Sequence, residues 1–152
     1  MEFIGSEYDT DAPGSESELK VWESLKDCFD SSDVGVAYYK YPIVDKSGGQ
    51  FDREPDFVIF HKELGLIIIE CKGFKIDNID RIDGYEWHLD GVSYGRTTPS
   101  EKARQQGFHL RSFFDRRPEL LDEQQNNVVN VNWFVALPNI SRDEWESRGA
   151  SL

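Results

Sequence analysis

The fold of this chain is decided by the stretch Glu54-Pro55-Asp56-Phe57-Val58-Ile59-Phe60 and by the stretch Leu66-Ile67-Ile68-Ile69-Glu70-Cys71-Lys72-Gly73. Both contain short apolar runs rich in β-branched residues, which are typical of strands buried on both faces. The residues between them are polar and end in a glycine, which predicts a hairpin with a longer loop. Charged side chains interrupt both stretches, and a buried strand seldom carries charges without a use for them.

The register of this hairpin follows from its loop. A loop centred on Glu63 places Asp56 opposite Glu70, and it pairs Phe60 with Leu66 and Val58 with Ile68. Opposed residues of antiparallel strands share a face with their Cβ atoms about 4.5–5.5 Å apart, and alternate residues of one strand share a face too. We therefore expect Asp56, Glu70 and Lys72 to project from the same side of the hairpin.

This arrangement needs a positive charge. Two ionised carboxylates about 5 Å apart repel by about 3 kcal/mol at an effective dielectric constant of 20. Lys72 is one source of positive charge, and a divalent metal ion is another. Oxygen ligands favour Mg²⁺ or Mn²⁺ over zinc. The structural alternative is an ordinary cross-strand ion pair in which Lys72 neutralises Glu70 or Glu54.

These residues resemble a known signature. Pro55-Asp56, a hairpin and Glu70-Cys71-Lys72 are similar to the Asp…Glu-x-Lys signature of the PD-(D/E)xK nucleases, and the surrounding sequence resembles one branch of them, the nuclease-related domain (NERD). Further matches to that branch extend over about residues 14–149. They are the Glu-x-x-Val-x-x-x-Leu pattern of Glu18, Val21 and Leu25, the hairpin residues Gly84-Tyr85-Glu86-Trp87, and the helix from Pro99 to Gln106.

The resemblance implies a fold and an activity. The fold is an α/β, restriction-endonuclease-like core with a mixed sheet flanked by helices, in the order αβββαβ. The activity is hydrolysis of phosphodiester bonds with Mg²⁺ or Mn²⁺, on DNA in preference to RNA. The implied metal ligands are Asp56, Glu70 and the carbonyl of Cys71. The implied catalytic residues are Asp56, Glu70, Lys72, Gln106 and Glu18.

Two of these assignments have structural alternatives. Ser15 and Glu18 match the capping box of an amphipathic helix, in which the carboxylate only reaches back to a main-chain amide. On a second helix, predicted from Pro99 to about Arg117, Lys102 and Gln106 continue the apolar face. They indicate either a polar pocket or a pair that snorkels to solvent at the helix end. The family has Gln where this chain has Lys102, although Lys still binds phosphate as a point charge.

Charge limits the surface that nucleic acid can use. The formal net charge is −12, which disfavours a broadly phosphate-binding surface. Only residues 99–117 are net basic, with five basic and two acidic side chains. The predicted nucleic-acid-binding residues are Lys102, Arg104 and Arg111. A solvated helix face explains such a run equally well.

The remaining expectations concern organisation. We expect a flexible acidic leader over residues 1–13 and one nuclease-like domain over residues 14–152, whose last helix is truncated. Other expected elements are a strand over 34–44, a hairpin of 85–89 with 92–94, a strand over 128–137, and a helix capped by Ser141 and Glu144. Two cysteines and no signal peptide or membrane span indicate a reducing, cytoplasmic location.

The expected partner is nucleic acid, with a helicase or another domain as a further one. The function from a different class is a catalytically inactive nuclease-fold module that binds nucleic acid or a protein partner such as a fused helicase. The low basicity and the Lys102 departure favour this alternative. The intact Asp56, Glu70 and Lys72 favour the enzyme.

Overall fold

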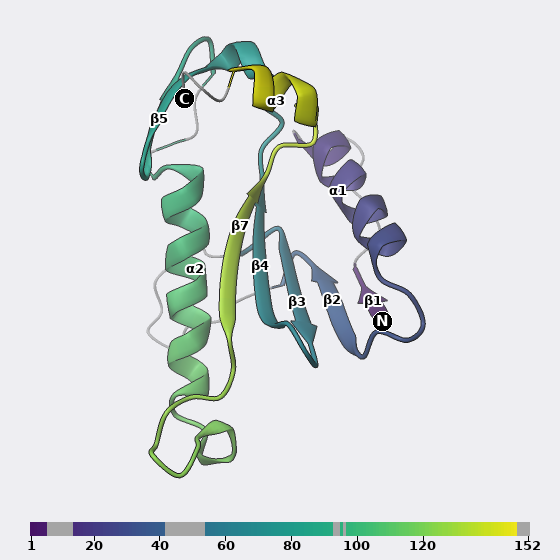
Figure 1. Cartoon of the computed structure of the whole chain (residues 1–152), viewed down its shortest axis with the longest axis vertical. Coiled ribbons are helices and arrows are strands. Elements are labelled where there is room, and N and C mark those ends of the chain that lie inside the picture. Colours follow the sequence, from purple (N-terminus) through teal and green to yellow (C-terminus); the bar gives the residue numbers. More distant parts are fainter. Residues whose placement is uncertain (6–13, 42–53, 93–94, 96, 149–152) are drawn as a thin grey trace.

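The computed structural model describes residues 1–5, 14–41, 54–92, 95 and 97–148 (Figure 1). Within them the chain forms a mixed α/β structure with one five-stranded mixed sheet and a separate two-stranded sheet. The strands are β1 (Glu2–Ile4), β2 (Gly35–Tyr39), β3 (Phe57–His61), β4 (Gly65–Cys71), β5 (Ile79–Asp83), β6 (Glu86–Leu89) and β7 (Val131–Ala136). The α-helices are α1 (Ser15–Cys28), α2 (Pro99–Phe114) and α3 (Arg142–Arg148).

The five-stranded sheet has the order β1-β2-β3-β4-β7. Its three central strands are antiparallel, and β1 and β7 each pair in parallel with their neighbour. The predicted pairs Phe60–Leu66 and Val58–Ile68 are confirmed. The ladder between β3 and β4 ends at the pair Phe57–Ile69, so the next position along it sets Asp56 opposite Glu70.

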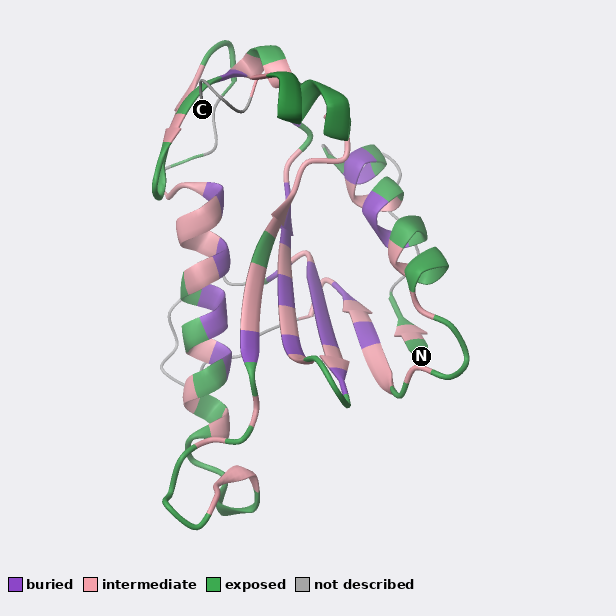
Figure 2. Ribbon diagram, viewed as in Figure 1, coloured by how far each residue is buried: buried purple, intermediate pink, exposed green. Residues whose placement is uncertain are grey.

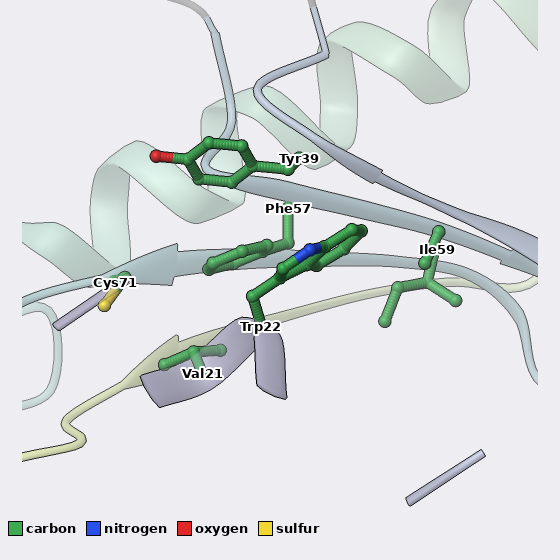
Figure 3. Close-up of a cluster of buried hydrophobic side chains, with 7 residues drawn as sticks. Val21, Trp22, Tyr39, Phe57, Ile59 and Cys71 are labelled. Atoms are coloured by element: carbon green, nitrogen blue, oxygen red, sulfur yellow. The ribbon is translucent and has the colours of Figure 1, made fainter. Parts of the chain in front are cut away.

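The two faces of the sheet bury two separate cores. On one face, α1 packs Trp22 against Phe57, with ring centroids 5.8 Å apart in a stacked arrangement (Figure 3). On the other face, α2 packs Leu110 against Val58 and Ile68. Successive side chains of a strand point to opposite faces, which is why adjacent residues of β3 belong to different cores. Buried positions accordingly follow β3 and β4 and the side of α2 that faces the sheet (Figure 2).

Helix α2 begins where the sequence predicts. The Thr98 side chain accepts the main-chain N–H of Glu101 at 3.2 Å, and Pro99 occupies the first turn. The helix ends at Phe114 instead of about Arg117. Gly107 allows α2 to approach β7 closely, because a Cβ there would lie 2.9 Å from the Trp133 ring.

The start of the chain differs from the expected leader. Glu2–Ile4 is an edge strand parallel to β2, and the Phe3 ring meets Trp22 edge-on at 5.3 Å. The Met1 ammonium donates to the carbonyls of Asp30 and Asp33. The expectation of a loose leader is therefore wrong for residues 1–5, because Phe3 packs on Trp22 and the segment pairs with β2. Residues 6–13 lie outside the described residues.

The small hairpin also differs from its prediction. It joins β5 to β6 through Gly84-Tyr85, with Gly84 at a φ of +59°, and does not turn at Asp90-Gly91. The predicted second strand, 92–94, is therefore wrong at Val92, and residues 93–94 are outside the described part. A register shift between Ile79 and Arg81 breaks the alternation of β5, which hides this strand in the sequence.

Two further predicted strands are shorter than expected, and the predicted helix cap at Ser141 is confirmed. The strand predicted over 34–44 ends at Tyr39, because Lys40 has a φ of +52°; residues 42–44 are outside the described part. The last strand is Val131–Ala136. The cap of α3 is confirmed, since Ser141 and Glu144 hydrogen-bond reciprocally. No helix in the described residues is both long enough and apolar enough to cross a bilayer.

Candidate active site

The ends of β3 and β4 bring the signature residues together. Asp56 directly precedes β3, and its carboxylate accepts the main-chain N–H of Cys71, the last residue of β4, at 2.7 Å. Glu70 is fully buried one residue earlier on β4. The hairpin thus places two carboxylates and Lys72 at one end of the sheet.

Glu70 is held by two lysines. Its Oε1 atom accepts from Lys72 Nζ at 2.7 Å and from Lys102 Nζ at 2.9 Å. Its Oε2 atom is buried and has no hydrogen-bond partner among the described residues. A buried carboxylate oxygen without a partner is costly, so this atom indicates a place for a bound ion or water.

Gln106 is the second orphaned group. It lies one turn after Lys102 on the face of α2 that packs on the sheet, and it is only 2% exposed. Neither its Oε1 nor its Nε2 atom has a hydrogen-bond partner within the described part of the chain. The amide therefore keeps both of its N–H donors and its carbonyl oxygen available for a ligand or for water. This supports the polar pocket and not the pair snorkelling into solvent.

The electrostatics centre on Asp56. Burial, then the charge of Glu70, raises the pKa of Asp56 to about 7, although the Cys71 N–H hydrogen bond acts in the opposite direction. The Asp56 side chain therefore lacks sufficient positive charge in its surroundings, even with two lysines on Glu70. Burial also raises the pKa of the Cys71 thiol to about 12, so this side chain packs as an apolar group.

Glu18 reaches the same region from α1. Its carboxylate accepts from the Tyr39 hydroxyl and lies 3.3 Å from Lys40 Nζ. The residue before the helix is Gly14, and no side chain caps that end, so the capping-box interpretation of Glu18 is wrong. The main-chain N–H of Lys40 donates to the Asp56 carbonyl at 2.8 Å, which ties the end of β2 to the site.

Tyr39 and Lys40 are site-associated residues that the sequence analysis missed. Burial and the hydrogen bond to Glu18 raise the pKa of Tyr39 to about 12, so its hydroxyl remains a donor. The only sequence signal for them is their place at the end of the first central strand, close to the end at which Asp56 and Glu70 were predicted to meet.

The donor set suits a small oxygen-seeking cation. The described residues contain no group of three or more His, Cys, Asp and Glu side chains arranged to hold a metal. Two carboxylates, Asp56 and Glu70, with a main-chain carbonyl are nevertheless enough for Mg²⁺, which takes one or two carboxylates and keeps several waters. The unpartnered Glu70 Oε2 and the raised pKa of Asp56 both fit an added cation.

The predicted nucleic-acid-binding residues do not form one cluster. Lys102 contacts Glu70, whereas the Arg104 guanidinium pairs with Glu101 at 2.8 Å and lies over the Tyr85 and Phe108 rings. Arg111 is exposed two turns beyond Arg104. Arg104 and Arg111 thus share one side of α2, away from the contact that Lys102 makes.

The fold is a mixed α/β domain in which the partly buried Asp56 and the fully buried Glu70 lie together at one end of the central hairpin. A scan of protein families matches the chain to the nuclease-related domain over residues 13–138. The match covers most of the 152 residues, and the chain belongs to this family. Searches of curated proteins and of solved structures returned no match. The matched region contains α1 through β7 and ends before α3.

Proposed function

We propose that the chain is a metal-dependent nuclease that hydrolyses phosphodiester bonds, with DNA preferred over RNA. The observation that carries this proposal is the convergence of Asp56, Glu70 and Lys72 at the ends of two adjacent buried strands. Membership in a nuclease-related family supports it. With β1 and the β5–β6 hairpin set aside, the order α1, β2, β3, β4, α2, β7 supports the finer assignment to the αβββαβ core of the PD-(D/E)xK nucleases.

Asp56, Glu70 and the Cys71 carbonyl would hold Mg²⁺ or Mn²⁺. A bound ion of this kind supplies Lewis-acid stabilisation of the charge that develops on the scissile phosphate. Asp56 would bind the metal ion as an ionised carboxylate. In the absence of a cation, burial and the charge of Glu70 raise the pKa of Asp56 to about 7. Binding of the ion would therefore favour the ionised form of Asp56 near neutral pH.

The other side chains act on water and phosphate. Lys72 would orient the attacking water and donate to a phosphate oxygen as charge develops there. Gln106 would position the same water or the phosphate, because its buried amide has both a donor and an acceptor available. Glu18, oriented by Tyr39 and Lys40, would accept from a water on the α1 side of the site.

The surface charge and the cysteine thiols support the substrate and the location that we propose. With a net charge of −12, contact with the nucleic-acid backbone would concentrate on α2, at Arg104 and Arg111 on one side of the helix and at Lys102 beside Glu70. A helicase or another domain would supply further contacts. Both cysteines are free thiols, and Cys28 is exposed, which suits a reducing cytoplasmic location.

Cleavage assays with purified protein test this function. Labelled single- and double-stranded DNA and RNA are incubated with Mg²⁺, Mn²⁺ or EDTA, using wild type, Asp56→Asn and Lys72→Ala. Lys62→Ala is the matched control, because Lys62 is an exposed lysine in the loop of the same hairpin. We expect cleavage only when metal is present. The cleavage rate should fall by about 100-fold or more in the two site variants, and the control should cleave at the wild-type rate. Equal cleavage by all four proteins would refute the assignment.

A specific observation favours the second candidate, an inactive nuclease-fold module that binds nucleic acid or a protein partner. Lys72 and Lys102 both contact Glu70 Oε1, so Glu70 has its charge neutralised by the chain itself. This function predicts no cleavage with either metal, together with binding of an oligonucleotide that gel-shift titration detects. Metal-dependent cleavage that Asp56→Asn abolishes would exclude it.

A further inference from the structure

Lys102 is the unusual cation of the site. It lies in the first turn of α2, and its Nζ atom is 2.9 Å from Oε1 of the fully buried Glu70. Lys72 Nζ approaches the same oxygen at 2.7 Å from two residues along the chain. Two ammonium groups therefore share one carboxylate oxygen, which is one more than charge neutrality at Glu70 requires.

The second ammonium affects the whole acidic pair. The charge of Lys102 acts on Asp56 as well, where it lowers the pKa against the larger effects of burial and Glu70. Asp56, Glu70, Lys72 and Lys102 together sum to zero when all four are charged. A divalent cation entering between the two carboxylates would meet two ammonium groups in a poorly solvated place, where like charges repel strongly.

We propose that Lys102 competes with the divalent cation for Glu70 and thereby weakens and sets the metal affinity of the site. This inference rests on the metal site of the proposed function. Lys102, and not Lys72, has this role because it reaches Glu70 from a separate element, α2, whereas Lys72 follows Glu70 by two residues in the same stretch of chain. A neutral residue at 102 leaves Glu70 with one lysine.

The geometry allows the exchange that such competition requires. The Lys102 side chain is 22% exposed although its partner Glu70 is fully buried. Its long aliphatic stem can therefore turn the ammonium towards solvent when a cation takes its place. Breaking a contact to a buried carboxylate is unfavourable, and this cost reduces the net affinity for the cation.

Calorimetric titration of the whole chain with Mn²⁺ tests this role without any activity measurement. Two neutral variants, Lys102→Gln and Lys102→Met, should bind Mn²⁺ about tenfold or more tightly than wild type, since removed repulsion appears directly as affinity. Lys102→Arg retains the charge and should bind as wild type does. Lys26→Gln, an equal loss of charge in an exposed ion pair with Glu23, is the matched control and should change nothing.

Glu70→Gln separates the inference from the function beneath it. If Glu70→Gln abolishes Mn²⁺ binding but both neutral Lys102 variants bind as wild type does, competition by Lys102 is refuted and the metal site stands. If neither wild type nor any variant binds Mn²⁺, the metal site and the inference both fail. They also both fail if Glu70→Gln binds Mn²⁺ as tightly as wild type does. Circular dichroism checks folding, and the Mn²⁺-induced rise in the unfolding midpoint is a second readout that should follow the same order.

Discussion

Asp56→Asn should make the metal-free protein more stable at alkaline pH. The fold raises the pKa of this carboxyl from 3.8 to about 7, through burial first and the charge of Glu70 second. A difference of about three pH units corresponds to about 4 kcal/mol at 1.36 kcal/mol per unit. Because the folded pKa is the higher one, the stability contributed by Asp56 is complete below about pH 4 and is lost as the pH rises through about 7.

Asparagine is the right replacement because it remains neutral and keeps an acceptor oxygen for the Cys71 N–H, which Asp56 binds at 2.7 Å. At pH 4 the variant and wild type should therefore unfold with similar free energies. At pH 8.5 the variant should be more stable by about 1–4 kcal/mol. Urea unfolding in EDTA at several pH values, monitored by circular dichroism, measures this difference. The comparison is valid where the denaturant dependence of the unfolding free energy, m, is the same for both proteins.

Asp27→Asn, at an exposed position of α1, is the matched control, and its effect should be small at every pH. The reasoning about Asp56 fails if Asp56→Asn changes stability by the same amount at pH 4 and pH 8.5. It also fails if the variant is the less stable protein at the higher pH. Either result means that burial and Glu70 do not raise the pKa of Asp56.

Three further substitutions test the scaffold by urea unfolding. Trp22→Ala should cost about 3–5 kcal/mol, because a nearly buried ring that stacks on Phe57 is lost; a cost below 1 kcal/mol would contradict this packing. Gly107→Ala should cost about 1–3 kcal/mol, since the new methyl group would lie 2.9 Å from the Trp133 ring, and an unchanged midpoint would argue against so close an approach of α2 to β7. Tyr39→Phe removes the hydroxyl that donates to Glu18 and should lower the free energy of unfolding by about 1 kcal/mol. If the two side chains are coupled, Tyr39→Phe should have a smaller effect in a protein that already carries Glu18→Gln.

Much of the site could be predicted because it is local. The register of β3 and β4 depends on one short loop and on alternating apolar residues, so Asp56 and Glu70 could be placed opposite each other. The start of α2 could be predicted because Thr98 and Pro99 act within a single turn. Strand β5 was missed because its irregular pairing removes the alternation on which such a prediction depends.

The sequence by itself determined the hairpin, the signature residues at its ends and the family. Only the tertiary structure decided that Glu18 binds Tyr39 instead of capping α1, and that Lys102 shares Glu70 with Lys72. The physical reason is that strand periodicity and turns act between neighbours, whereas these contacts join residues far apart in the chain. The contacts of Glu18 and Lys102 form because α1 and α2 pack on opposite faces of one sheet. The packing of each helix decides which polar groups its side chains can contact.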